Sequence, residues 1–595
     1  MPPDETSSAP VSSEELVPAS QGEPPGQKEL PGGKELPGAP VLPGELTIPA
    51  LLAVRRRLDG AVQALVSDDE EITYAGLDDA SRALAGRLVA AGVTKGSRVG
   101  LVMPNGIEWA TAALAVMRVG AVLVPLSTLL RPPELLAQLR VAAVTHLVLV
   151  PRLRGRDHLD ELSSVAPGLT GQARRGHPHP DVPSLRWIWT SDELPTGAAP
   201  AAVVEALGRV VRPADDLVVL FTSGSRGAPK GVLHTHGGGL RAVASSLDSR
   251  RIGRGERLYI PMPFFWTGGF GGGLLSALVA GATLLTEAVP EPARTLRFLE
   301  RERVTLFRGW PDQAARLAAH PAFATTDLST LRPASLAAVL PPAARPVPGA
   351  RANLFGMTET FGPYCGSPLD TDLPAGRHGS CGRPFPGVEV RIADPETGAS
   401  LPPGTEGEIR LRGPSVMRGI AGRTRADVFD ADGFYPTADR GLLDADGYLW
   451  FRGRLDDMVK VRGATVYPME VEAVLRALPG VTDAYVTDIA AAAAAADVGA
   501  EAEAGPGAGG AREVAAVVVA RSLDDPAELA DPAELAELAR QARAHLSSFK
   551  IPTRWLLVRD PHRVPRLASG KVDIDALRRL LAEEGTPGSP KTRSQ

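Results

Sequence analysis

A glycine-rich loop with one lysine lies in the stretch FTSGSRGAPKGVLHTH, between Phe221 and His236. Backbone N–H groups of such glycines form an anion-binding concavity, hydroxyl side chains add donors, and a lysine adds a point charge. The stretch differs from the usual P-loop, in which Gly-Lys precedes Ser or Thr. A plain hairpin loop is the alternative. The expected phosphate-binding residues are Thr222, Ser223, Gly224, Ser225, Gly227 and Lys230.

A hydroxyl and a carboxylate stand together in LFGMTETFG, at Thr358 and Glu359. Mg²⁺ in proteins takes one or two carboxylates plus phosphate oxygens, so Glu359 is the candidate metal ligand. The alternative is a surface glutamate at a helix N-terminus. Thr358 and Glu359 are candidate catalytic residues.

Two further stretches carry polar residues suited to a nucleotide. In DGFYPTADRG, Asp439 follows a Tyr-Pro turn, and a carboxylate of this kind accepts both ribose hydroxyls in dinucleotide folds. Arg454 lies downstream. In VPRLASGKVD, Lys571 follows Ser-Gly on a loop and is a candidate catalytic residue that swings onto the substrate. A surface lysine in a turn is the alternative.

The order of these motifs resembles the superfamily of AMP-forming acyl-CoA synthetases, nonribosomal adenylation domains and luciferases. FTSGSRGAPKG is similar to the family's phosphate loop, FGMTE to its Tyr-Gly-x-Thr-Glu motif, and TADRG to its Thr-Gly-Asp motif with Ala438 in place of glycine. GRLDDMVKVRG resembles the hinge motif and LASGK the C-terminal lysine motif. The resemblance runs from about Leu46 to Glu583 and is far more specific for the superfamily than for a substrate.

The resemblance implies two half-reactions. A carboxylate attacks the α-phosphorus of ATP and pyrophosphate leaves; a thiol, usually that of coenzyme A, then attacks the acyl-adenylate. No residue has to act as a nucleophile. The implied contacts are the Thr222–Lys230 loop for the β- and γ-phosphates, Thr358 for the α-phosphate, Glu359 for Mg²⁺, Phe355 near adenine, and Asp439 with Arg454 on the ribose.

A mobile C-terminal domain is also implied by the resemblance. Asp456 occupies the hinge position, and Lys571 bridges carboxylate and α-phosphate oxygens during adenylation. After rotation, Lys571 leaves the site and the segment Lys460–Gly463 approaches the thiol, so Gly463 counts among the cofactor-binding residues.

The expected acyl pocket is formed by Phe265, Trp266, Gly268 and Gly269 in the FWTGG stretch. Trp266 stands where acyl-CoA synthetases often have a histidine. The glycine-rich run that follows favours both tight helix packing and room for an acyl chain. We therefore expect an acid–thiol ligase that activates an apolar acid, fatty or aryl, for transfer to coenzyme A. The alternatives are a ligase that loads an acyl carrier protein, and a catalytically impaired nucleotide-binding homologue, since SLAAVLPPAARPVPGARANLFGMTE lacks the family's adenine-cradling glycines.

The elements that must position these residues alternate between helix and strand patterns, with helices over 81–93 and 108–120 and strands over 97–103 and 121–126. The stretch from Arg154 to about residue 184 is expected to be a loop with solvated histidines. The predicted fold is α/β: a large N-terminal domain of α/β subdomains plus a distorted β subdomain, and a small α+β C-terminal domain on a hinge. The predicted boundaries are a disordered tail over 1–45, an N-terminal domain over 46–453, a C-terminal domain over 454–583 with a flexible insert over 490–512, and a disordered tail over 584–595.

Composition restricts the function classes further. With 595 residues the chain exceeds one hydrophobic core, and a net charge of −5 gives no footprint for nucleic acid. The 2 cysteines rule out a disulfide scaffold and favour a reducing compartment. The sequence shows no secretory signal and no apolar run of the ~20 residues that a membrane helix needs. A cytoplasmic enzyme is expected.

Overall fold

The computed structural model of the chain describes residues 41–173, 176–222, 229–347, 349–352, 354–455, 459–461, 464–466, 468–490, 512–520, 532–566 and 572–587. All of these residues belong to a single structural unit.

The phosphate-loop residues lie on a mostly parallel sheet with the strand order β19-β10-β9-β4-β3-β5-β8. Neighbours from β9 to β8 pair in parallel, whereas β10 pairs antiparallel with both β9 and β19. The parallel strands are apolar almost throughout because helices cover both faces. The strands are β3 (Arg98–Val102), β4 (Val122–Pro125), β5 (His146–Leu149), β8 (Trp187–Thr190), β9 (Asp216–Thr222), β10 (Lys230–Thr235) and β19 (Gly419–Ile420).

A second sheet has the order β13-β11-β12-β1-β2 and is parallel except for the β1–β2 pair. Its strands are β1 (Gln63–Ser67), β2 (Glu70–Thr73), β11 (Arg257–Tyr259), β12 (Thr283–Thr286) and β13 (Leu306–Phe307). The two sheets share one hydrophobic core, in which Trp109 contacts Phe264 and Phe270 edge to face at 5.2 and 5.8 Å between ring centroids.

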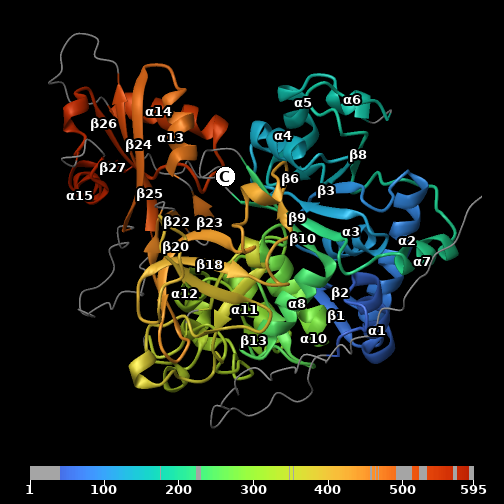
Figure 1. Cartoon of the computed structure of the whole chain (residues 1–595). Coiled ribbons are helices and arrows are strands. Elements are labelled where there is room, and N and C mark those ends of the chain that lie inside the picture. The colour runs from blue at the N-terminus through green and yellow to red at the C-terminus, as the bar shows by residue number, and fades with distance from the viewer. Residues whose placement is uncertain are drawn as a thin grey trace, which may run out of the picture. The chain divides into compact units, whose positions relative to one another are not determined.

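Helices fill the space around these sheets, and Figure 1 shows the blue helices α1 to α3 flanking β1 to β3. Their starts follow the sequence: Thr73 caps α2 by accepting from the Gly76 amide at 3.1 Å, and Thr235 caps α8 by accepting from the Gly238 amide at 3.0 Å. The helices are α1 (Ile48–Asp59), α2 (Tyr74–Ala90), α3 (Ile107–Arg118), α4 (Pro132–Val141), α7 (Ala201–Arg209), α8 (His236–Leu247), α9 (Thr267–Gly269), the π-helix η1 (Phe270–Leu275), α10 (Ser276–Ala280), α11 (Pro292–Arg301) and α12 (Pro311–Ala318).

An antiparallel β subdomain follows. One sheet is formed by β14 (Phe355–Met357), β15 (Gly362–Gly366) and β16 (Arg383–Pro384), and another by β17 (Glu389–Ala393), β18 (Gly407–Arg412), β20 (Tyr435–Leu443) and β21 (Leu449–Arg454). This arrangement confirms the predicted α/β fold with a distorted β subdomain.

The residues after 458 form an α+β part with hydrophobic clusters of their own, drawn from residues 459–581. The hairpin β22 (Val459–Val461) and β23 (Ala464–Val466) is followed by a sheet of order β24-β25-β26-β27. The strands of this sheet are β24 (Val481–Ala490), β25 (Arg512–Ala520), β26 (Arg554–Val558) and β27 (Thr586–Pro587), and the helices of the C-terminal part are α13 (Pro468–Arg476), α14 (Pro532–His545) and α15 (Ile574–Glu584). These elements are drawn in orange and red in Figure 1. Thr586 and Pro587, which the sequence assigned to a disordered tail, pair with β26, and residues 588–595 lie outside the described residues.

A buried charged cluster joins this C-terminal part to α4. Lys550 lies with its amine 3.1 Å from Glu134 Oε1 and 2.5 Å from Glu470 Oε1, and Ser547 Oγ donates to Glu134 Oε2 at 2.5 Å. We refer to Glu134, Glu470, Ser547 and Lys550 as the Lys550 cluster. Burial lowers the pKa of Lys550, but the two carboxylates outweigh burial and raise it above its usual value.

The stretch from Arg154 to residue 184 departs from the prediction of a loop. Its described part contains β7 (Arg156–Asp157), which pairs with β6 (Arg152–Leu153) just before the stretch, and the helices α5 (His158–Val165) and α6 (Leu169–Ala173). His179 is buried rather than solvated, because its ring bonds the Pro167 carbonyl at 3.1 Å and accepts from the Asp181 amide at 3.1 Å.

Candidate active site

A cavity of about 1790 Å³ collects most of the residues singled out from the sequence. Typical small-molecule pockets hold about 300–1,000 Å³, so this cavity has room for a nucleotide and an acyl group together. Its walls come from the ends of β9 and β14, the start of β10, the α9–η1 segment, the loop after β13, β20 and the C-terminal part.

The two described ends of the phosphate loop face each other at the cavity. Thr222 ends β9 and Lys230 begins β10, and the two residues are partners in the antiparallel ladder. The Thr222 hydroxyl is buried and has no hydrogen-bond partner among the described residues. Ser223, Gly224, Ser225 and Gly227 lie outside the described residues, so their phosphate contacts stay predictions.

Lys230 meets the predicted metal ligand directly. Its amine contacts Glu359 Oε1 and donates to Tyr435 Oη at 2.9 Å, while Tyr435 Oη donates to the same Glu359 oxygen at 3.1 Å. Burial raises the pKa of Glu359, but the charge of Lys230 and the hydrogen bonds from Lys230 and Tyr435 outweigh it and hold the pKa below its usual value. The carboxylate is therefore ionised at neutral pH, as a magnesium ligand must be.

The turn that carries Glu359 is fixed from two sides. His234 donates from Nε2 to the Thr358 carbonyl at 2.7 Å, and the Met417 amide donates to the Glu359 carbonyl at 2.7 Å. Because the Thr358 carbonyl can only accept a hydrogen bond, the neutral His234 ring must carry its proton on Nε2. Burial lowers the pKa of His234 to about 4, so the imidazole is neutral near pH 7.

Phe361 closes the same turn and anchors it in the core. Its φ is 58°, in the left-handed region, and its ring lies 4.9 Å from the His234 ring and 5.8 Å from the Phe270 ring. A Cβ on Gly271 would approach the Phe361 ring to 3.0 Å, so glycine there leaves the ring its place. The position of Glu359 thus depends on the packing of Phe361 against residues that are distant in the sequence, namely His234, Phe270 and Gly271.

Asp439 and Arg454 form a cross-strand ion pair between β20 and β21, with Nη1 3.0 Å from Oδ1. Arg454 also donates to the Thr437 carbonyl at 3.1 Å. Ala438 has a φ of 58°, a left-handed conformation that costs an alanine about 1–2 kcal/mol and a glycine very little. Thr437, Ala438 and Arg454 line the cavity. The ribose contact of Asp439 and Arg454 stays a prediction.

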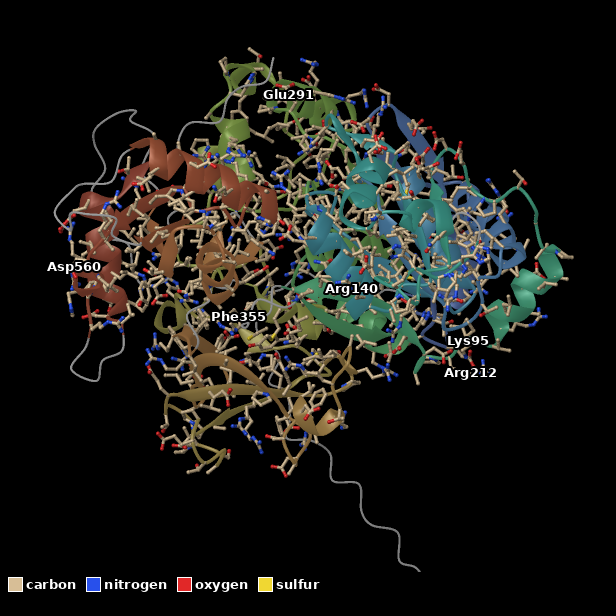
Figure 2. The ribbon with its side chains drawn as sticks, turned by 90° about the horizontal axis from the view of Figure 1, so that it is seen from above. Lys95, Arg140, Arg212, Glu291, Phe355 and Asp560 are labelled. Atoms are coloured by element: carbon tan, nitrogen blue, oxygen red, sulfur yellow. The ribbon has the colours of Figure 1, made fainter. Side chains whose placement is uncertain are left out.

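Phe355 packs into the β subdomain. Its ring lies 4.8 Å from Phe451 and 5.5 Å from Tyr364, and the cavity lining here comes from its neighbours Leu354 and Gly356. Figure 2 shows Phe355 surrounded by other side chains, whereas Arg212 and Asp560 lie at the edge of the molecule. Its stacking near adenine stays a prediction.

The acyl pocket predicted from FWTGG has an aromatic wall. The Trp266 ring lies 5.3 Å from Phe265, 5.6 Å from Trp310 and 6.2 Å from Phe549 of the C-terminal part, and all four residues line the cavity.

The two glycines of the stretch differ in what they do. Gly268 lines the cavity, while a Cβ on Gly269 would lie 2.1 Å from the Pro263 carbonyl oxygen. Both glycines permit tight packing, because a Cβ on Gly268 would lie 2.7 Å from Met262 Sδ; only Gly268 of the two also lines the cavity.

Besides the four phosphate-loop residues, three further predicted residues lie outside the described residues: the catalytic Lys571, the hinge residue Asp456 and the cofactor-binding Gly463. Ala464, next to Gly463, lines the cavity. The cysteines are not candidates for chemistry, because both are free and buried, and burial raises the pKa of Cys381 to about 11.

Residues 55–421 match the family model described as AMP-binding enzyme. The chain belongs to the AMP-binding enzyme family. A 3-[(3aS,4S,7aS)-7a-methyl-1,5-dioxo-octahydro-1H-inden-4-yl]propanoyl:CoA ligase of Mycobacterium tuberculosis is 34% identical over 87% of this chain and 95% of the ligase. A feruloyl-CoA synthase of an Amycolatopsis species is 32% identical over 72% of this chain and 82% of the synthase.

A solved amide bond synthetase of Marinactinospora thermotolerans superposes with a TM-score of 0.66 at 27% identity, covering 87% of this AMP-binding enzyme and 97% of the synthetase. The protein is an AMP-forming CoA ligase of this family, and it uses ATP, Mg²⁺ and coenzyme A. No helix among the described residues is long and apolar enough to cross a membrane.

Sequence reasoning missed Tyr435 and His234 as parts of the site. Both stand inside quoted motifs. Tyr435, Thr437 and Asp439 alternate along β20, and all three are buried, so period-two spacing from Asp439 was the available signal. His234 gave no such signal, because its partner is a backbone carbonyl on a distant turn.

Proposed function

We propose that the protein activates a carboxylic acid with an apolar body, fatty or aryl, as its acyl-adenylate and transfers the acyl group to coenzyme A. One observation carries the proposal: the Lys230–Glu359–Tyr435 cluster lines the same cavity as the Trp266 wall. A phosphate-binding end and an apolar end thus share one space. The relatives named for feruloyl, dioxo-indenyl-propanoyl and indoleacetate groups support an apolar acid.

We assign the roles of the chain's own residues as follows. Lys230 supplies positive charge to the phosphates, Thr358 donates toward the α-phosphate, and Glu359 holds the metal. Negative charge that develops on phosphorus is stabilised by groups fixed before the reaction, and the hydrogen bonds of Tyr435 and His234 supply that fixation. Mg²⁺ at Glu359 neutralises phosphate charge when bound.

Before a nucleotide binds, Lys230 is engaged with Glu359. Competition of phosphate oxygens for the Lys230 amine frees the carboxylate for the metal, so phosphate and metal binding support each other. Trp266 and Phe265 exclude water from the acyl end, which protects an adenylate that water would hydrolyse. The free, buried thiols of Cys365 and Cys381 support a cytoplasmic location.

The test is pyrophosphate release from Mg·ATP across fatty and aryl acids, with and without coenzyme A, and with mass spectrometry of the thioester. We expect acid-dependent release that rises with coenzyme A, and a loss of about 100-fold or more in Glu359→Gln. Glu537→Gln, at an exposed carboxylate that does not line the cavity, is the matched control.

Transfer to a carrier protein without transfer to coenzyme A would support the carrier-protein alternative. ATP binding without release from any acid would refute the proposal and support a nucleotide-binding homologue that has lost turnover.

A further inference from the structure

Two arginines line the acyl side of the cavity, and the proposed function does not use them. Arg250 follows α8, and Arg308 follows β13 immediately before Gly309 and Trp310 of the aromatic wall. Arg250 is only 6% exposed, and Arg308 is partly exposed to the cavity.

The hydrogen bonds of Arg250 tie it to the glycine-rich helix of the acyl pocket. Nη1 donates to Ser276 Oγ at 2.8 Å, and Nη2 donates to the Gly272 carbonyl. Gly272 itself lines the cavity. These partners lie on η1 and α10, not on the Lys230–Glu359 cluster, which places the arginines at the acyl end.

Arg308 is held by Arg250 but keeps most of its donors free among the described residues. Its Nη2 donates to the Arg250 carbonyl oxygen, while its Nε is buried and has no hydrogen-bond partner there. A guanidinium carries five N–H donors in a planar fork.

No described carboxylate forms an ion pair with either guanidinium, whereas neighbouring arginines are paired. Arg251 lies 2.8 Å from both Asp248 and Asp370, and Arg351 lies 3.2 Å from Asp372. Burial lowers the pKa of Arg250 to about 10, and burial together with the charge of Arg250 lowers the pKa of Arg308 to about 9. Both side chains therefore stay charged at neutral pH.

Burying a charge without a partner is costly, so a site of this kind is completed by an acceptor that the protein does not supply. A wholly apolar acyl group would leave Arg308 desolvated and unpaired. An oxygen atom on the acyl group would accept from the free guanidinium donors.

We propose that Arg308 selects acids whose apolar body carries an oxygen acceptor, a keto group or a second carboxylate, remote from the carboxylate that reacts. The backbone carbonyl of residue 250 orients Arg308 by accepting from its Nη2. The proposal rests on the proposed function and deepens it, because it names a polar feature within an otherwise apolar substrate class. It makes Arg308 the specificity-determining residue of the acyl pocket.

The test uses acids that share one skeleton: 3-cyclohexylpropanoate, 3-(4-oxocyclohexyl)propanoate and 3-(4-carboxycyclohexyl)propanoate. For each, kcat/KM of pyrophosphate release is measured with the wild type, Arg308→Met and Arg308→Lys. We expect the wild type to favour an oxygenated acid over the cyclohexyl acid by about 10- to 100-fold, the range of a hydrogen bond to a charged group. The keto and dicarboxylic acids show which acceptor the site takes.

Arg308→Met should abolish or invert this preference, and Arg308→Lys should keep part of it. Arg351→Met, at a neighbouring lining residue that is already paired, should affect all three acids alike. A fold defect would also lower all activities alike, so the ratio between acids is the informative quantity.

Equal or better turnover of the cyclohexyl acid by the wild type would overturn the proposal and leave the ligase function standing. An unchanged ratio in Arg308→Met would do the same. Calorimetric binding of the three acids in the presence of AMP tests the same preference without turnover. If no acid caused pyrophosphate release, the proposed function would be refuted, but the calorimetric affinities would still show whether Arg308 favours oxygenated acids.

Discussion

Replacing Lys550 by methionine removes the charge of the Lys550 cluster and keeps most of the apolar stem. Glu134 and Glu470 then share a buried space without a cation; their side chains are 13% and 12% exposed. Breaking a buried ion pair costs about 3–5 kcal/mol, because the remaining charges stay desolvated. Burial already raises the pKa of Glu470 with Lys550 present. Its ionised form is therefore already disfavoured in the folded protein, and removal of the Lys550 charge disfavours it further.

The free-energy cost of burying the two carboxylates without a cation can be avoided if they become exposed to water. Glu134 lies on α4, whereas Lys550 and Glu470 belong to the C-terminal part, so separation of the two returns both carboxylates to water. We therefore expect Lys550→Met to undock the C-terminal part from α4 rather than to unfold either. A cost of about 3 kcal/mol corresponds to a change of about 100-fold in the docking equilibrium.

Hydrogen exchange measured by mass spectrometry checks this expectation. Protection of α4 and of residues 545–550 should fall sharply in Lys550→Met, while the core of the large sheets keeps its protection. Lys550→Met combined with Glu134→Gln and Glu470→Gln should recover docking. Arg540→Met, which removes an exposed ion pair with Glu537, is the surface control. Unchanged protection in Lys550→Met would refute the reasoning.

Other predictions concern the strained and buried residues of the site. Ala438→Gly should stabilise the protein by about 1 kcal/mol, measured by urea unfolding, because glycine adopts the left-handed φ of 58° without strain; a loss of stability would contradict this. Burial lowers the pKa of His234 to about 4 in the folded protein, whereas the ring takes up a proton near pH 6.5 in the unfolded chain. The free energy of unfolding should therefore fall as pH drops from about 6.5 toward 4. His234→Gln, which keeps a donor for the Thr358 carbonyl, should flatten that part of the acid unfolding curve. Lys571→Ala should abolish adenylation and spare thioester formation from a synthetic acyl-adenylate; equal loss of both half-reactions would remove the assigned role.

Periodicity predicted the elements that are long and regular. The spacing over 81–93 and 108–120 corresponds to α2 and α3, whose apolar faces are buried against the core. The same reasoning failed over residues 154–184, because α5 and α6 are too short and too polar to show a period. A hydrophobic period becomes visible only in a helix longer than about two turns.

In the candidate site, too, the sequence indicated individual residues but not the contacts between them. Lys230 and Glu359 were predicted as separate motif residues, and their contact was not, because it depends on how distant strands pair. Tyr435 lies on β20, more than 70 residues from either partner in the sequence, so its hydrogen bonds with Lys230 and Glu359 arise only in the folded chain. Arg250 and Arg308 were indistinguishable from other arginines in the sequence, since only the fold deprives them of carboxylate partners.

The wall formed by Trp266 and Trp310 also has an optical consequence. Indole emission shifts with the polarity around the ring, and Phe549 of the C-terminal part completes the surroundings of Trp266. Trp109 and Trp555 are fully buried in the hydrophobic clusters and supply a steady background. The chain therefore carries its own fluorophore at the contact between its acyl pocket and its C-terminal part, and any change in the contact between Trp266 and Phe549 should alter its intrinsic fluorescence without an added label.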